Sequence, residues 1–183
     1  RGNVQLEANT ILNNSGAGGG GVSVIDGDST TIRGNLIRGN QLTGSGAGTG
    51  GGGVRLTGSG QPLLVGNVIV ENGSTLRGGG VFVDARSRIV NNTIAANLSQ
   101  SASALFVESS PLTVVNNIML GGLTASVIDC RTGGSGTIGA GDEFVTNNVF
   151  SSTGASISPN CSTSLAEGAN VSVSPSFVDP SNG

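Results

Sequence analysis

An asparagine recurs along this chain at a fixed place between two apolar side chains, and this repeat constrains the fold more than any other feature. The six asparagines are Asn9, Asn35, Asn67, Asn92, Asn117 and Asn148. The intervals between them are 26, 32, 25, 25 and 31 residues. A period of this size with variable insertions is typical of solenoid proteins, in which each repeat is one coil whose loops can lengthen.

Two apolar columns flank the asparagine column. Two residues after each asparagine stand Ile11, Ile37, Ile69, Ile94, Met119 and Phe150, and three residues before it stand Leu6, Ile32, Leu64, Ile89, Val114 and Val145. A second asparagine series follows five residues later at Asn14, Asn40, Asn72 and Asn97, and lapses at Gly122 and Thr153. The repeat therefore predicts one continuous apolar core with a polar column at a corner of each coil.

Short β-branched segments complete each coil. A Gly-Gly-Val strand opens at residues 20–24, 52–56 and 79–83, and residues 104–107 hold the same place in the fourth coil. No stretch has a helical period. Parallel strands cannot be joined by tight hairpins, so coils of this length favour a winding in which each strand pairs with its equivalents above and below. We expect an all-β parallel solenoid of about six coils. Its corner asparagines should adopt the left-handed backbone conformation and bond one another from coil to coil.

These repeats resemble the right-handed parallel β-helix superfamily to which pectate lyases belong. The resemblance rests on residues 89–97 (Ile-Val-Asn-Asn-Thr-Ile-Ala-Ala-Asn), on residues 114–119, and on the ending at residues 147–150 and 174–180. It covers essentially the whole chain, and it is more specific for the fold than for an activity. More narrowly, the chain looks like the secreted bacterial proteins with a choice-of-anchor Q domain. The resemblance implies a single-stranded right-handed β-helix in an exported protein.

We expect one β-helix domain over residues 1–183, forming part of a longer exported chain, because the sequence starts at Arg1 in the middle of a repeat. The abundance of Gly, Ser, Thr and Asn, with only 10% charged residues, fits an extracellular or cell-surface location. No apolar run is long enough to span a membrane.

The two cysteines occupy equivalent positions on successive coils. Cys130 lies 13 residues after Asn117, and Cys161 lies 13 residues after Asn148. Adjacent strands are about 4.8 Å apart, which is within the Cα separation that a disulfide spans. The register therefore predicts a Cys130–Cys161 disulfide, and two free thiols are the alternative. The same register predicts that Glu7 and Arg33 are neighbours across one rung.

The composition removes several kinds of chemistry. The chain has no His, Tyr, Trp or Lys, so it lacks the usual general base at neutral pH, most transition-metal sites and the best aromatic platforms for sugars. Its net charge of −3 argues against nucleic-acid binding. We expect no cofactor. Calcium in glycine-rich turns would need an aspartate where Ser23 and Arg55 stand.

Asp, Glu and Arg remain as candidates for catalysis. In the pectate lyase branch, carboxylates hold calcium and a basic residue removes a proton from a uronic acid. The candidates of these types here are Asp26 and Asp28, and the group Asp84, Arg86 and Arg88, all following a Gly-Gly-Val strand. None of them matches a lyase motif residue by residue, so solvated turn residues are the simpler interpretation.

Two classes of function remain open. The first is a non-catalytic extracellular scaffold for adhesion or structural, including filamentous, assembly, with an extracellular polysaccharide or a second copy at the coil ends as partner. The second is a polysaccharide lyase, hydrolase or epimerase that uses an Asp and Arg groove. A carbohydrate-binding module without turnover is a third hypothesis, which the absence of Trp and Tyr disfavours. A carboxylate cluster on adjacent coils would favour the enzyme.

Overall fold

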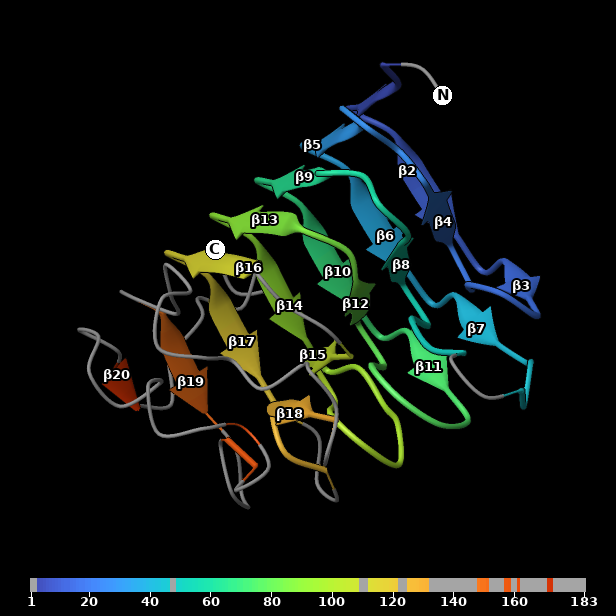
Figure 1. Ribbon diagram of the computed structural model, residues 1–183. Coiled ribbons are helices and arrows are strands. Elements are labelled where there is room, and N and C mark those ends of the chain that lie inside the picture. Colours follow the sequence, from blue (N-terminus) through green and yellow to red (C-terminus); the bar gives the residue numbers. More distant parts are fainter. Residues whose placement is uncertain are drawn as a thin grey trace, which may run out of the picture.

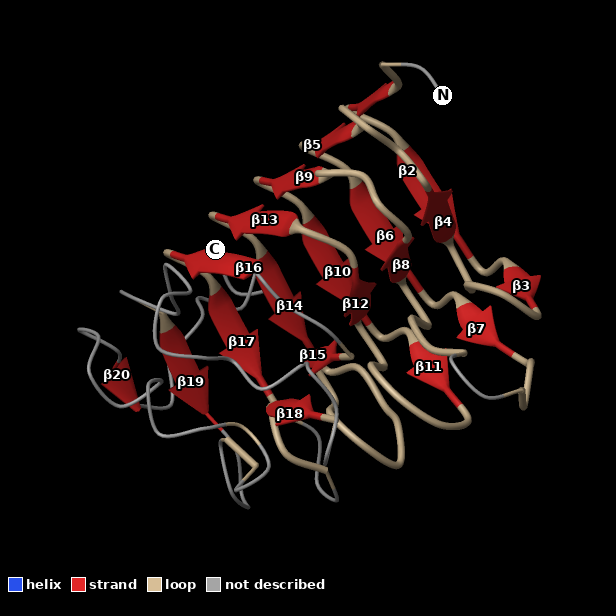
Figure 2. Cartoon of the chain, viewed as in Figure 1, coloured by secondary structure: helices blue, strands red, loops and turns tan. Residues whose placement is uncertain are grey.

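The computed structural model describes residues 3–46, 49–108, 112–121, 125–131, 148–151, 157–158, 161 and 171–172. Within these residues all regular structure is β-strand, and every strand pair is parallel (Figure 2). The strands stack into four sheets along one axis, with the N-terminus at one end of the stack (Figure 1). The expected all-β parallel solenoid is therefore confirmed.

Each sheet collects one strand from successive coils. The first sheet contains β1 (Gln5–Glu7), β5 (Thr31–Arg33), β9 (Leu63–Val65), β13 (Ser87–Val90) and β16 (Leu112–Val115). The second contains β2 (Thr10–Leu12), β6 (Leu36–Arg38), β10 (Val68–Val70), β14 (Thr93–Ala95), β17 (Ile118–Leu120), β19 (Val149–Ser151) and β20 (Val171–Ser172). The third contains β3 (Ser15–Gly16), β7 (Gln41–Leu42) and β11 (Gly73–Ser74). The fourth contains β4 (Val22–Ile25), β8 (Val54–Thr57), β12 (Val81–Asp84), β15 (Leu105–Val107) and β18 (Ile128–Cys130).

The described residues complete about four full turns, slightly fewer than the expected six coils. The five strands of the first sheet, from β1 to β16, close four turns. The second sheet continues through β19 and β20, where only short segments are described. Below, the coils that begin with β1, β5, β9, β13 and β16 are called coils 1 to 5, and the coil that contains β19 is called coil 6.

The core is built from the predicted columns together with the inward residues of the fourth sheet. Fully buried side chains include Ile32, Leu64, Ile89 and Val114 from the first sheet, Ile37, Ile69, Ile94 and Met119 from the second, and Val54, Val81 and Leu105 from the fourth. Leu6 and Ile11 in coil 1 are partly buried against the same cluster. The two columns read from the sequence are therefore the walls of one continuous core.

The first asparagine ladder runs unbroken from Asn9 to Asn148. In each step the side-chain Nδ2 and the backbone N of one asparagine both donate to Oδ1 of the asparagine one coil on, at 3.0–3.2 Å and 2.7–3.0 Å respectively. From Asn35 onward Nδ2 also donates to the carbonyl of the column residue one coil back, as Asn92 does to Leu64 at 2.9 Å. Each ladder residue from Asn35 to Asn117 therefore ties three coils together.

A second ladder of the same geometry runs through Asn14, Asn40, Asn72 and Asn97, with Nδ2 to Oδ1 distances of 3.0 Å. It explains the Gly-Gly-Val pattern, because Gly21, Gly53 and Gly80 lie against it. A Cβ at any of these glycines would lie 3.0 Å from Nδ2 of the ladder asparagine in the next coil. The glycines therefore make room for the second ladder.

The expected backbone conformation of the ladder asparagines is wrong. Where the structure describes both residues, the one before the ladder asparagine, and not the asparagine itself, has the left-handed conformation. In the first ladder these residues are Ala8, Gly34, Gly66, Asn91 and Asn116, with φ between 53° and 64°. The preceding residue makes the bend, so that the asparagine can turn its side chain inward between the coils. Gly and Asn suit that position because both tolerate left-handed φ.

Candidate functional site

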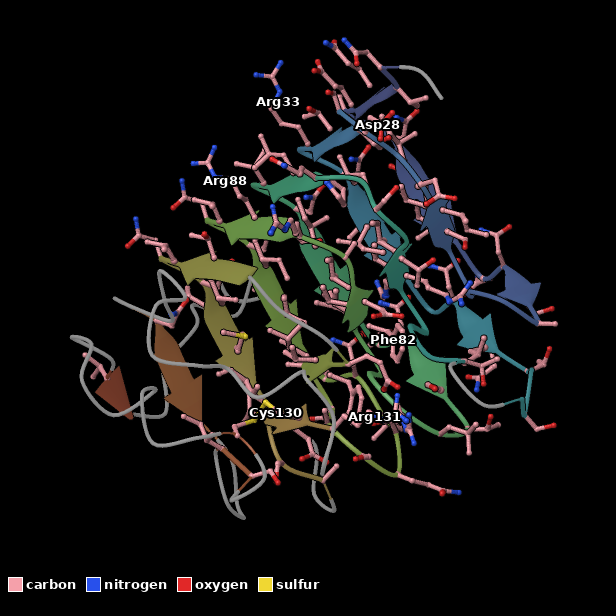
Figure 3. The ribbon with its side chains drawn as sticks, in the orientation of Figure 1. Asp28, Arg33, Phe82, Arg88, Cys130 and Arg131 are labelled. Carbon is pink, nitrogen blue, oxygen red and sulfur yellow. A yellow bond between two sulfur atoms is a disulfide. The ribbon has the colours of Figure 1, made fainter. Side chains whose placement is uncertain are left out.

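The four catalytic candidates from the sequence are not brought together. Asp26 and Asp28 follow β4 in coil 1, at the N-terminal end of the stack (Figure 3). Asp84 ends β12 in coil 3, and the register places it beside Thr57, which in turn lies beside Ile25. Two strand spacings, about 10 Å, therefore separate Asp84 from the residue that precedes Asp26.

Hydrogen bonds give Asp26 a role between coils. Its Oδ1 accepts hydrogen bonds from the backbone N and the Oγ of Ser59 in the next coil, at 2.9 and 3.2 Å. The backbone carbonyl of Asp28 accepts from Gln61 at 3.4 Å. Both contacts join coil 1 to coil 2, so this turn is tied to its neighbour along the stack.

Arg86 lies on the surface between the fourth and first sheets, and Arg88 lies in β13 of the first sheet. The side chain of Arg86 is exposed between the buried residues Ala85 and Ser87. Arg88 is exposed on the outer face of β13, and Figure 3 shows its side chain projecting away from the sheet. Asp84 ends β12 while Arg88 lies on β13, so the predicted group spans two strands and the corner between them.

The outer face of the fourth sheet carries a cluster that sequence reasoning missed. The register places Arg55, Phe82, Phe106 and Asp129 in one column on four successive coils. Phe82 and Phe106 point out of the coil, yet they are only 0% and 3% exposed. Their rings stack with centroids 5.8 Å apart and an interplanar angle of 4°. The backbone at Gly50 lies against the Phe82 ring, so a loop of coil 2 covers this ring.

Glu108 is the centre of this cluster and is 7% exposed. Arg77 of coil 3 donates from Nη1 to Oε2 of Glu108 at 2.9 Å, and Arg131 of coil 5 donates from Nη1 to Oε1. The Arg77 guanidinium also lies 5.0 Å from the centroid of the Phe106 ring. A carboxylate buried to this extent needs charged partners, and two arginines supply them.

Two further carboxylates flank Glu108. Val83 pairs with Val107, so Asp84 at the end of β12 lies one rung from Glu108. Asp129 on β18 accepts a short hydrogen bond from the hydroxyl of Ser101, which belongs to coil 4. Carboxylates and arginines from three successive coils therefore meet on one face. The signal for this was available, because Glu108 follows its strand where Asp84 follows the strand one coil earlier.

In this structure the cluster links neighbouring coils through ion pairs. Both oxygens of Glu108 accept from guanidinium groups, so the carboxylate is engaged by coil 3 on one side and by coil 5 on the other. Glu7 and Arg33, the pair expected from the register, also form an ion pair, at 2.9 Å. Arg38 and Glu71 form another at 2.8 Å. Each pair joins neighbouring coils.

The described residues contain no group of three or more His, Cys, Asp or Glu that could hold a metal ion. Two hollows lie in the described surface. One, of ≈ 320 Å³, opens at the N-terminal end and is lined largely by apolar residues such as Leu6, Val24 and Ile32. The other, of ≈ 490 Å³, is a shallow groove beside the third sheet, lined by Gln41, Glu71, Ser74, Leu98 and Gln100 among others.

A disulfide joins Cys130 on β18 to Cys161 in coil 6, as the register predicts. The Cα atoms are 5.0 Å apart, and both side chains are buried, at 1% and 6% exposure. Cys130 lies opposite Val107 and points into the core. No helix in the described part of the chain has the length and apolar character required to cross a membrane.

The stacked parallel sheets, the inward columns and the asparagine ladders define a parallel β-helix. A family model described as the right-handed beta helix region matches residues 1–174. The chain belongs to the right-handed β-helix family. Comparisons with curated proteins and with solved structures give no match.

Proposed function

We propose that this β-helix is a non-catalytic scaffold at the cell surface or outside the cell, which serves adhesion or structural assembly. One observation carries the proposal: four ion pairs in the described residues each join two different coils. Arg33–Glu7, Arg38–Glu71, Arg77–Glu108 and Arg131–Glu108 connect residues 23 to 33 positions apart in the chain. Seven charged side chains therefore hold neighbouring coils in register.

The hydrogen-bond ladders support the same proposal. Two columns of buried carboxamides tie the coils of a stack that already shares one apolar core. Buried, fully bonded polar networks make a structure rigid and specify a single register. A rigid rod that presents loops at fixed spacing suits a display or assembly role. Its proposed partners are an extracellular polysaccharide or a second copy of the chain.

A specific observation favours an enzyme as the second candidate. Asp84 and Glu108 lie on adjacent coils of one face, with Arg77 and Arg131 beside them. Paired carboxylates and a nearby cation are the groups that a lyase, hydrolase or epimerase acting on an acidic polysaccharide requires. The engagement of both Glu108 oxygens by arginines weighs against this role, because a general base needs a free oxygen.

A depolymerisation assay separates the two candidates. The folded protein is incubated with acidic and neutral polysaccharides, with and without calcium, and unsaturated products and new reducing ends are followed. Turnover that is lost in Asp84→Asn but kept in Asp26→Asn would overturn the scaffold proposal and identify the Glu108 face as the active site. The scaffold proposal predicts no products from any substrate.

Two further measurements test adhesion and assembly themselves. Co-sedimentation with insoluble polysaccharides and electron microscopy at high protein concentration should reveal retention on a polymer, or rods longer than one molecule. A protein that forms no products, stays in solution and remains monomeric would contradict the adhesion and assembly roles together.

A further inference from the structure

One member of the second ladder stands in a sequence context that makes it chemically labile. Asn72 is followed by Gly73. Residues with a side chain follow the other three members, Asn14, Asn40 and Asn97. The backbone N that follows an asparagine can attack the carboxamide of that asparagine, and glycine permits this attack best because it has no Cβ and a freely rotating backbone. Asparagine is thermally labile in proteins, and Asn72 is the most reactive asparagine of this ladder.

The folded coil engages the attacking nitrogen and both heteroatoms of the carboxamide. The backbone N of Gly73 donates to the Asn40 carbonyl at 2.8 Å. Nδ2 of Asn72 donates to the Ile37 carbonyl at 2.9 Å and to Asn97 Oδ1 at 3.0 Å. Oδ1 of Asn72 accepts from the backbone N and Nδ2 of Asn40, at 2.9 and 3.0 Å. Asn72 is also only 1% exposed, so its reaction requires that this corner of the coil open first.

The backbone and the packing at position 73 do not require a glycine. The register of the third sheet places Gly73 beside Gln41 in coil 2 and Leu98 in coil 4, so the equivalent positions carry side chains. The φ of Gly73 lies outside the left-handed region. An added Cβ would approach Oε1 of Gln41, which is the end of a flexible, exposed side chain that can move aside. Gly73→Ala is therefore a variant that the fold can accept.

We propose that Asn72–Gly73 is a latent modification site, which the second ladder protects and which reacts without an enzyme when this corner of coil 3 opens. The backbone N of Gly73 forms a bond to Cγ of Asn72 and loses its proton. The Cγ–Nδ2 bond breaks, and ammonia leaves with that proton. Water then opens the cyclic imide at either carbonyl and leaves aspartate or isoaspartate at position 72. The reaction consumes water and needs no oxidant or reductant.

Conversion at position 72 breaks the ladder, because a carboxylate has no N–H to donate. An oxygen replaces Nδ2 and faces two acceptors, the Ile37 carbonyl and Asn97 Oδ1. Buried acceptors that face each other without a donor destabilise the folded state. Isoaspartate in addition routes the backbone through Cβ within the third sheet. Each opening of this corner therefore carries a risk of permanent damage in the middle of the stack.

Peptide mapping of the full chain measures the conversion, because one peptide contains its own control. Trypsin cleavage after arginine releases residues 56–77, which contain Asn72 and also Asn67, an asparagine followed by a β-branched residue. The protein is held at neutral pH, folded or in guanidinium chloride, and samples are digested at mildly acidic pH and analysed by mass spectrometry. In denaturant, Asn72 should convert well before Asn67. In the folded protein, conversion at Asn72 should be slower by about two orders of magnitude.

Two alanine variants in coil 4 separate protection by the second ladder from overall stability. Asn97→Ala removes the Oδ1 that accepts from the backbone N and Nδ2 of Asn72. Asn92→Ala removes the Oδ1 that accepts from the same two groups of Asn67. Both side chains are buried, so both variants lose stability. In the folded variants, Asn97→Ala should accelerate conversion at Asn72 by about tenfold, whereas Asn92→Ala should leave it within about twofold.

Gly73→Ala tests the chemistry apart from the ladder, since it should slow conversion at Asn72 in denaturant by about tenfold or more. Equal conversion of Asn67 and Asn72 in denaturant, or equal rates at Asn72 in the folded and unfolded protein, would overturn the proposal. Equal acceleration by Asn92→Ala and Asn97→Ala would overturn it too, because conversion would then follow overall unfolding. The comparison of folded with unfolded protein needs no variant, so it decides the question even where a variant fails to fold.

Discussion

Replacing Asn92 by alanine tests the ladder at a buried, fully bonded position. The Asn92 side chain donates to the Leu64 carbonyl at 2.9 Å, the Val90 carbonyl at 3.0 Å and Asn117 Oδ1 at 3.0 Å. Its Oδ1 accepts from the backbone N and the Nδ2 of Asn67, at 2.9 and 3.0 Å. Five hydrogen-bond contacts in the buried interior therefore depend on one carboxamide, whose two N–H groups are shared among three acceptors.

The contacts differ in how much free energy of unfolding is lost when each is removed. Asn67 Nδ2 keeps its bonds to Ile32 and Val65, and Asn117 Oδ1 keeps its bond from the Asn92 backbone N. The backbone N of Asn67 loses the acceptor it uses in the ladder, and an unsatisfied buried donor costs about 1–3 kcal/mol. Each remaining bond contributes a net value of about 1 kcal/mol or less. We expect Asn92→Ala to lower the free energy of unfolding by about 3 kcal/mol.

Urea denaturation followed by circular dichroism measures this change, with the slope checked for a change in cooperativity. The matched control is Asn9→Ala at the open end of the same ladder, where the side chain is exposed and Asn35 Oδ1 still accepts from the Asn9 backbone N. We expect a loss below about 1 kcal/mol there. Equal losses in the two variants would refute the account of the ladder as a buried, cumulative network.

Three further predictions concern the backbone and the core. Ala96→Gly should raise the melting temperature slightly, by relieving a left-handed φ of 54° that costs an L residue about 1–2 kcal/mol, whereas Ala95→Gly in β14 should lower it. Gly53→Ala should lower the melting temperature, because the added methyl would lie 2.7 Å from the Gly80 carbonyl and 3.0 Å from Asn72 Nδ2. Ile94→Asp should abolish the β-sheet circular dichroism spectrum, because it places an unpaired charge at a fully buried position.

The repeat made the coil predictable because the same local environment recurs. Position by position, Leu64, Asn67 and Ile69 have equivalents one coil away, so a periodic sequence fixes the register that the structure shows. The same count placed Glu7 beside Arg33 and Cys130 beside Cys161. Contacts between equivalent positions are therefore within reach of sequence reasoning.

Features that depend on loop paths were not predictable in the same way. In the sequence Phe82 occupies an outward position of its strand, because Val81 and Val83 point inward. A loop of coil 2 nevertheless buries it, and the length of this loop differs from coil to coil. Glu108 meets Arg77 because the segment between β11 and β12 lies beside coil 4, where Arg77 forms a bridge to Ser101. The left-handed residue was misplaced by one position, since an asparagine pair such as Asn91 and Asn92 does not reveal which member bends.

The ladders have a direction, and that direction matters while the chain is being synthesised. Asn35 offers two donors, its backbone N and Nδ2, to an oxygen that belongs to Asn67, one coil closer to the C-terminus. On the ribosome the N-terminal coil emerges first, so the backbone N of its ladder asparagine donates to water until the next coil is made. Every new coil thus supplies the acceptor for the backbone N of its predecessor's ladder asparagine, while its own Nδ2 already donates to a carbonyl one coil back. The rod therefore grows in one direction, and the newest coil is the least stable part of the molecule until the next coil pairs with it.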